Sequence, residues 1–213
     1  MARLAAVRVT GRLARAGLAA GLLALAAGVL VWGAERLPLL DRLVFGYDWH
    51  NYWVMFQGGW PDYAAVDVFN PPWTLLLLLP LGALSFKAGW ALLTLLNLIV
   101  LLVSVPPRAA GRPDLPAIAA LLFAFWTLRH LADGNLAVFM VGGFLLLEAG
   151  WRRGSPWLLA AGLVLATAKP QESALALAAL GIMLVRDWPP RRWALAGGLA
   201  LAGMLPALAL LGA

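Results

Sequence analysis

The sequence contains no cysteine, and charged side chains are scarce, at 12% of its 213 residues. Without cysteine the chain has no disulfide framework, no thiol nucleophile and no thiolate metal site. Hydrophobic residues make up 63% of the chain, and the mean hydropathy is +0.85. A soluble core cannot account for so much apolar surface at this length. The composition therefore predicts an integral membrane protein with an all-α fold.

The positive charge is placed in a way that argues against a nucleic-acid partner. Lysine and arginine outnumber acidic residues by 16 to 10. The arginines lie between apolar runs and form no stripe, so we expect them to set membrane topology. Four of them precede the first apolar run, 16–32, which is long for a cleaved signal peptide and just long enough for a span. We expect a retained first helix, with residues 1–15 as a basic cytoplasmic N-terminus.

Apolar runs continue along the chain and leave no room for a soluble domain. They predict a single transmembrane domain, 1–213, built as a polytopic bundle of about seven to eight helical segments. Several runs have about 12–16 residues, whereas a straight crossing needs about 20. Such segments must be broken, tilted or re-entrant, which is tolerated only inside protein or beside a wet cavity. The later runs are 73–86, 88–105, 117–131, 135–150, 157–168, 172–185 and 193–211.

The charges outside these runs predict which segments share a side of the membrane. Segment 33–72 carries five acidic residues against two arginines and is expected to be the first extracytoplasmic loop. Two arginine-rich loops should be cytoplasmic, 151–154 and 186–192. By alternation, two polar turns then face the same side as Asp48, at 133–135 and 169–171. This alternation requires that one element between residues 73 and 131 does not cross fully.

Asp48 is the leading candidate for chemistry. It lies in the sequence Tyr-Asp-Trp-His at 47–50, a polar and aromatic stretch on an otherwise apolar chain. In one interpretation Asp48 caps a helix in an interfacial loop, and the aromatic rings anchor that loop at the membrane surface. In the other, its carboxylate is a general base that activates a hydroxyl nucleophile. The neighbouring side chains predicted to contact a substrate are His50, Tyr52, Tyr63 and Asn70.

A second polar group interrupts the apolar sequence at 129–135. Charged residues in or beside apolar segments are costly and are therefore candidates for function. Arg129 either pairs with Asp133, four residues further on, or joins His130 in holding a phosphate. Asn135 either caps the following helix or contacts a substrate.

A third polar group lies at 169–172, between two short apolar runs. Lys169 either snorkels to the surface or pairs with Glu172, or it offers its ammonium to a lipid phosphate. Gln171 beside it is a further predicted substrate contact. Glu148, by contrast, is expected to pair with Arg152 four residues later.

Taken in order, these pieces resemble the integral-membrane glycosyltransferases of GT-C type, in particular the polyprenyl-phosphate-mannose-dependent mannosyltransferases of glycosyltransferase family 87. That family has an acidic residue in the first extracytoplasmic loop, a Tyr/Phe-x-Pro-Pro helix entry, a Gly-Gln/Asn turn, and a Lys-Pro element after an Arg-Arg-Gly loop. The matching residues here are Asp48, Phe69-Asn70-Pro71-Pro72, Gly134-Asn135, Lys169-Pro170 and Arg152-Arg153-Gly154. The resemblance extends over about residues 16–200. Members of the family are usually much longer, and asparagine in the turn is a shorter polar arm than glutamine.

The resemblance implies a donor sugar, expected to be mannose, on a polyprenyl phosphate, and an acceptor hydroxyl on a glycan, glycolipid or protein. Asp48 would take the hydroxyl proton during an inverting attack on the anomeric carbon. Lys169, Arg129 and His130 would hold the departing phosphate. The resemblance implies no cofactor and no metal. The expected location is the plasma membrane, as a multi-pass protein of bacterial origin in contact with membrane lipid.

Two other functions stay open at this point. A lipid or sugar transporter, or a flippase, would use the same polar groups along a substrate path. Such a protein is expected to show two matching halves, and the sequence shows no convincing internal repeat. A non-catalytic membrane subunit of a larger glycosyltransferase is the other alternative, in which a second membrane chain completes the site.

Overall fold

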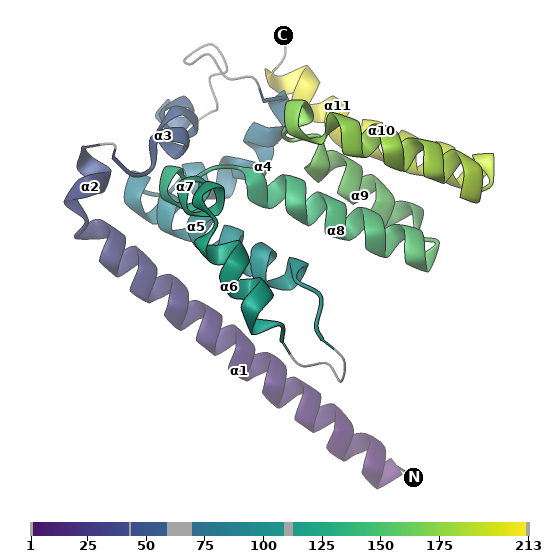
Figure 1. Cartoon of the computed structure of the whole chain (residues 1–213), viewed down its shortest axis with the longest axis horizontal. Coiled ribbons are helices and arrows are strands. Elements are labelled where there is room, and N and C mark those ends of the chain that lie inside the picture. The colour runs from purple at the N-terminus through teal and green to yellow at the C-terminus, as the bar shows by residue number, and fades with distance from the viewer. Residues whose placement is uncertain (1, 43, 59–69, 109–112, 212–213) are drawn as a thin grey trace.

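The computed structural model describes residues 2–42, 44–58, 70–108 and 113–211, and the regular structure in these ranges is entirely helical, as predicted. Figure 1 shows the long first helix leaving the other helices toward its N-terminus, while the last four helices gather at the end of the bundle away from α2 and α3. The elements are α1 (Ala2–Glu35), α2 (Pro38–Asp41), α3 (Tyr47–Trp53), η1 (Val54–Phe56), α4 (Pro72–Gly82), α5 (Phe86–Ser104), α6 (Leu115–Phe123), α7 (Phe125–Asp133), α8 (Ala137–Arg153), α9 (Pro156–Ala166), α10 (Pro170–Asp187) and α11 (Pro190–Leu211).

Each apolar run of the sequence coincides with a helix or with a pair of helices, because the runs end at residues that start or stop helices. Helices α4, α9 and α10 have proline in the first turn, where its fixed φ suits a helix and its missing N–H is not needed. The side chains of Ser85, Asp114 and Ser155 cap α5, α6 and α9 by accepting a backbone N–H three residues on.

Three helices in the described part of the chain are long and apolar enough to cross a membrane. They are Gly17–Glu35 within α1, Phe86–Ser104 and Pro190–Leu210. Helices α6 and α7 make a fourth candidate only as a bent pair. Helices α4 and α9 have 11 residues each. Each of them rises about 16 Å, well short of the hydrocarbon core of about 30 Å. The three long apolar helices support a membrane protein, whereas α4 and α9 are too short to cross a membrane by themselves.

Two segments depart from the simple pattern of runs and loops. The run 117–131 forms two helices that meet at a 62° bend, where Ala124 takes an extended conformation with φ −61° and ψ 133°. Segment 33–72, predicted as a loop, contains α2, α3 and η1 and the end of α1. Its helix α3 packs inward, with Trp49 completely buried and Tyr52 8% exposed. These two rings therefore belong to the core and do not act as surface anchors.

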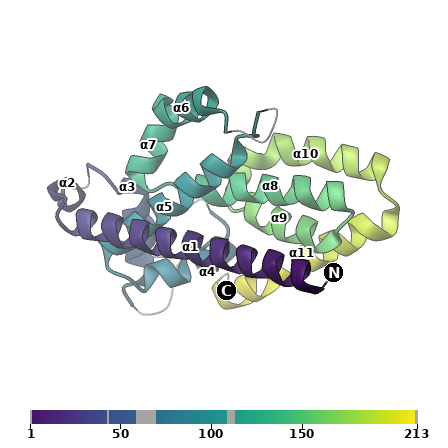
Figure 2. The same ribbon diagram turned by 90° about the horizontal axis from the view of Figure 1, so that it is seen from below.

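Close backbone contact joins α8 to α9. Gly143, Gly150 and Gly162 form the contact: a Cβ at Gly143 would lie 2.4 Å from the backbone N of Ala166, and one at Gly162 would lie 2.8 Å from the Gly143 carbonyl oxygen. Small residues at such an interface let two apolar helices approach closely within a membrane. Figure 2 shows α8, α9 and α11 lying together beside α10.

The helices α3, α4 and α5 form the core at the other end of the bundle, around Trp49, Met55, Leu75, Leu78 and Leu93. The indole N–H of Trp49 donates to the carbonyl oxygen of Phe86 at 2.9 Å. A Cβ at Gly89 would lie 2.4 Å from the Trp49 ring, so only glycine leaves room for it. This packing places the first turn of α3 next to the turn between α7 and α8.

Candidate functional site

The first turn of α3 is positioned from both ends. Gly46 precedes it in the left-handed conformation, with φ +77°, and donates its N–H to the carbonyl oxygen of Ala132 at 2.7 Å. Trp49, one residue after Asp48, is locked into the core. Asp48 itself is half-buried and its side chain caps no helix; the residue at the cap position of α3 is Gly46.

The turn between α7 and α8 presents Asn135 to Asp48. Gly134 ends α7 with φ +69°, and a Cβ there would lie 2.7 Å from the Cβ of Trp49. The backbone of Asn135 is held at both ends, because its N–H donates to the His130 carbonyl oxygen at 2.9 Å and its own carbonyl oxygen accepts from Asn97 Nδ2 at 3.0 Å. Its side chain then points at two charged groups.

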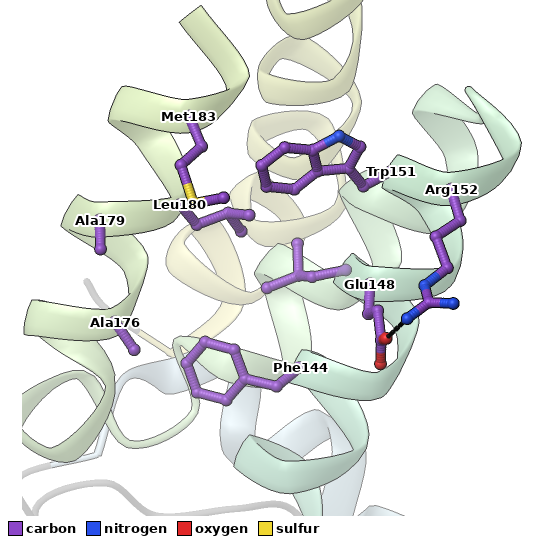
Figure 3. Close-up of a pocket in the computed structure, with 9 residues that line it drawn as sticks. Phe144, Glu148, Trp151, Arg152, Ala176, Ala179, Leu180 and Met183 are labelled. Carbon is purple, nitrogen blue, oxygen red and sulfur yellow. Dashed lines mark ion pairs between the residues drawn. The ribbon is translucent and has the colours of Figure 1, made fainter. Parts of the chain in front are cut away.

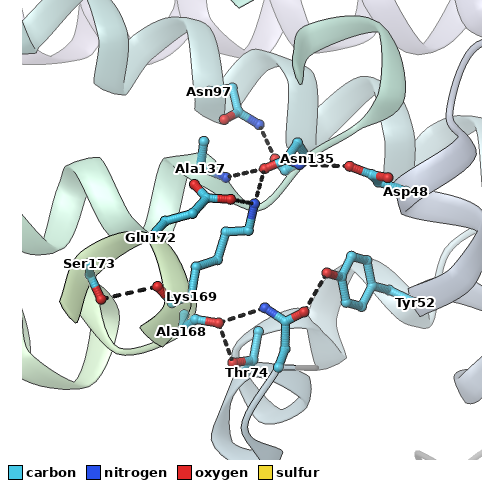
Figure 4. A network of polar contacts seen from close by, with 11 residues as sticks. Asp48, Tyr52, Thr74, Asn97, Asn135, Ala137, Ala168, Lys169, Glu172 and Ser173 are labelled. Atoms are coloured by element: carbon cyan, nitrogen blue, oxygen red, sulfur yellow. Dashed lines mark hydrogen bonds and ion pairs between the residues drawn. The ribbon is translucent and has the colours of Figure 1, made fainter. Parts of the chain in front are cut away.

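The carboxamide of Asn135 bridges Asp48 and Lys169, as Figure 4 shows. Asn135 Nδ2 donates to Asp48 Oδ2 at 2.6 Å, and Asn135 Oδ1 accepts from Lys169 Nζ at 2.9 Å. The same oxygen accepts the backbone N–H of Ala137, the first residue of α8, at 3.0 Å, although the cap position itself is Leu136. Asn135 therefore contacts the start of α8, near the capping role that was predicted for it, while its contact with a substrate stays a prediction.

Lys169 lies at the junction of α9 and α10 and is buried, with a side chain 7% exposed. A buried ammonium is costly unless it is paired and hydrogen-bonded. It forms an ion pair with Glu172, in the first turn of α10, in addition to its bond to Asn135. A carboxylate in that turn is also favoured by the helix dipole, whereas a cation is not. Pairing with Glu172, one of the two plain alternatives for Lys169, is what the structure shows.

A second set of hydrogen bonds reaches the same junction from α3 and α4. The Tyr52 hydroxyl donates to Asn70 Oδ1 at 2.7 Å, and Asn70 Nδ2 donates to the Ala168 carbonyl oxygen at 2.6 Å. Thr74 donates to that carbonyl as well, at 3.3 Å. Asp48 and Tyr52 thus stand one helical turn apart on α3, and both connect to residues 168–169.

Five of the predicted site residues join this network: Asp48, Tyr52, Asn70, Asn135 and Lys169. The imidazole of His50 packs instead against the rings of Trp53 and Phe86. Gln171 is exposed on the first turn of α10, outside the network. Tyr63 lies outside the described residues.

Arg129 and His130 flank the network without entering it. Arg129 pairs with Asp133 through Nε, as the plain interpretation predicted, and its side chain remains 58% exposed. It also lies close enough to Asp48 for the two charges to attract. His130 lines a small cavity of about 40 Å³ with Asn97, between α5, α7 and α8.

Sequence reasoning missed three members of the network. Thr74 and Asn97 lie within apolar helices and are 0% and 2% exposed, and Ser173 is completely buried and donates to the Lys169 carbonyl oxygen. Glu172 was predicted only as an ion-pair partner. The available signal for Thr74 and Asn97 was a single polar residue inside an apolar run, which marks a hydrogen bond in a membrane helix.

The chain matches no protein-family model, and neither a curated protein nor a solved structure shows significant similarity to it. Within the described ranges, no three histidine, aspartate or glutamate side chains group together as a metal site would require. The chemistry assigned to the network therefore depends on its own geometry and on the motifs of the sequence.

Proposed function

We propose that this protein is a polytopic plasma-membrane glycosyltransferase of GT-C type. It moves a sugar, expected to be mannose, from a polyprenyl-phosphate donor to an acceptor hydroxyl on the extracytoplasmic side. One observation carries the proposal. The half-buried Asp48 carboxylate forms no ion pair with any described residue and is held by a neutral amide, that of Asn135. A carboxylate oriented in this way keeps lone pairs available for a proton, which a general base requires.

In the proposed reaction, the acceptor hydroxyl oxygen attacks the anomeric carbon of the sugar while Asp48 takes the hydroxyl proton. The bond between the anomeric carbon and the phosphate oxygen breaks, and the polyprenyl phosphate leaves with the electron pair. Attack from the face opposite the leaving group inverts the configuration at that carbon. The proton on Asp48 then passes to water.

The geometry supports different roles for the predicted cations. Lys169 is buried and already paired with Glu172, so its ammonium fixes the Asn135 amide and, through that amide, the orientation of Asp48. Arg129 engages Asp133 through Nε and keeps its terminal amino groups on an exposed side chain, from which they can reach a phosphate. We therefore assign phosphate contact to Arg129 and positioning to Lys169.

Transport is the second candidate, and one observation favours it. The network lies where helices are interrupted, at Gly134 between α7 and α8 and at Lys169 between α9 and α10. Transporters place substrate and ion sites at interrupted helices of this kind. The two candidates differ in what they require of Asp48, because only the transferase needs its carboxylate to accept a proton from a hydroxyl.

The test is to compare Asp48→Asn with Asp41→Asn in the full chain reconstituted in lipid vesicles. Asp41 belongs to the same segment, but it is exposed and pairs with Lys87 at 2.9 Å, away from the network. The vesicles contain polyprenyl-phosphate mannose with radiolabelled sugar, together with lipid and glycan acceptors. Both transfer of label to the acceptor and binding of the donor are measured.

For a transferase, Asp48→Asn lowers the transfer rate by at least about 100-fold, the lower end of a general base's contribution, and leaves donor binding within a few fold. Asp41→Asn retains the wild-type rate, because an exposed ion pair contributes under about 1 kcal/mol. Equal transfer rates in wild type and Asp48→Asn would refute the proposal. Label that crosses the membrane without joining an acceptor would favour transport instead.

A further inference from the structure

A second site lies between α8 and α10, further along both helices than the network. Helices α8 and α10 are separated by an open groove of about 560 Å³, shown in Figure 3. Its lining is apolar except at one end and includes Phe144, Leu147, Trp151, Ala179, Leu180 and Met183. From Phe144 to Arg152 the groove follows α8 for about 12 Å. This shape accommodates a single flexible hydrocarbon chain.

The polar end of the groove is strongly basic. Arg152 lines it and pairs with Glu148 at 2.6 Å, yet its side chain is 78% exposed. Arg192 extends from α11 to the turn after α8, because a Cβ at Gly154 would lie 3.2 Å from Arg192 Nη1. The ends of α8 and α10 and the start of α11 bring five arginines to this end: Arg152, Arg153, Arg186, Arg191 and Arg192.

We propose that this groove binds an anionic phospholipid, with one acyl chain between α8 and α10 and the phosphate among the arginines. Guanidinium groups bind phosphate through two parallel hydrogen bonds, and basic pockets between membrane helices bind anionic head groups. Among the residues that the structure describes, the carboxylates beside these five arginines are those of Glu148 and Asp187, so a net positive charge is left for a ligand to balance. An anionic phospholipid matches both parts of the site, because its acyl chain fits the apolar groove and its phosphate fits the arginine-rich end.

A second copy of the chain fits this face less well than a lipid does. A two-fold contact across the groove, with both chains in the same membrane orientation, would bring the two sets of arginines together, and like charges in contact disfavour an interface. The head-group end of the lipid site is also separate from the network. Lys169 precedes α10, whereas the arginines stand at its far end, 18 residues along the helix and therefore about 27 Å away.

The test uses the full chain in detergent micelles, titrated with phosphatidylglycerol or with phosphatidylcholine of the same acyl chains and monitored by native mass spectrometry. Two variants probe the two parts of the site. Arg152→Gln/Arg153→Gln removes charge at the head-group end, and Ala179→Trp fills the groove. A matched control, Arg36→Gln/Arg42→Gln, removes the same charge from a remote part of the chain.

The wild-type chain is expected to bind phosphatidylglycerol at least about tenfold more tightly than phosphatidylcholine. The Arg152/Arg153 variant loses that preference, Ala179→Trp weakens binding of both lipids, and the remote control retains wild-type behaviour. Equal affinity of the wild type for the two lipids would overturn the proposal. An equal loss of preference in the remote control would also overturn it, because that result would indicate diffuse charge attraction. A third refuting result would be a protein dimer that Ala179→Trp dissociates while lipid binding is unchanged. Glu148→Gln gives an independent check, because releasing Arg152 from its partner should raise the affinity for phosphatidylglycerol.

Discussion

Lys169→Met provides a strong test of the polar network, because the side chains are similar in length and only the ammonium is lost. In the wild type this ammonium contacts Glu172 and Asn135 Oδ1. Breaking a buried ion pair by removing one partner costs about 3–5 kcal/mol, whereas an exposed pair contributes under about 1 kcal/mol. Lys169 is 7% exposed and Glu172 is 37% exposed. Because only one partner is buried, we expect a loss of ~2 kcal/mol.

For a chain of this size such a loss lowers Tm by about 4–8 °C. The measurement is thermal unfolding in detergent, followed by intrinsic tryptophan fluorescence, for wild type, Lys169→Met, Glu172→Gln and the double variant. Replacing both charges removes the uncompensated partner, so the double variant should be more stable than the sum of the single changes predicts, by ~1 kcal/mol or more. Two results would contradict this reasoning: a Lys169→Met variant as stable as wild type, or a double variant whose loss of stability equals the sum of the two single losses. Either result would mean that the ammonium is solvated and that the network does not hold it.

Three glycine substitutions, one of them a control, test the packing that supports the site. Gly143→Ala should destabilise the chain by about 1–3 kcal/mol, because its Cβ would lie 2.4 Å from the backbone of Ala166. The neighbouring Gly142→Ala should be neutral or slightly stabilising, since the nearest atoms to its Cβ lie at 4.0 Å and alanine favours a helix. Gly134→Ala should lower Tm and also weaken transfer, because the left-handed turn and the contact with Trp49 both exclude a Cβ. Unfolding curves for the three variants check these expectations, and equal effects of Gly143→Ala and Gly142→Ala would contradict the close helix contact.

Much of the fold could be predicted from the sequence, because an apolar run between helix signals has few alternatives in a membrane. The break at Ala124 could not, since neither proline nor glycine marks it in the sequence. Helix α3 was also missed as an inward-facing element. At seven residues it is too short to be stable by itself, and it is held by the burial of Trp49 and Tyr52.

Part of the site could also be predicted, from the placement of charges along the sequence. Charge alternation predicted that Asp48, Asn135 and Lys169 share one side of the membrane, and in the structure they share one hydrogen-bond network. Alternation gives only the side, however, and not the contact between side chains. The exclusion of His50 and Gln171 from the network follows from tertiary packing that no local pattern encodes. Thr74 and Asn97 stand out in the sequence as polar residues inside apolar runs, but their hydrogen-bond partners also depend on that packing.

The bridge formed by Asn135 has a consequence for biosynthesis. Asp48 and Asn135 are 87 residues apart, and Lys169 comes 34 residues later still. At typical rates of synthesis the ribosome needs on the order of ten seconds to extend the chain from the first of these residues to the last. Asp48 must therefore wait for Asn135 while α4 to α7 are made and inserted, and Asn135 must wait for Lys169 while α8 and α9 follow. The network closes only when α10 begins, so a nascent chain interrupted before that point carries Asp48 but no assembled site.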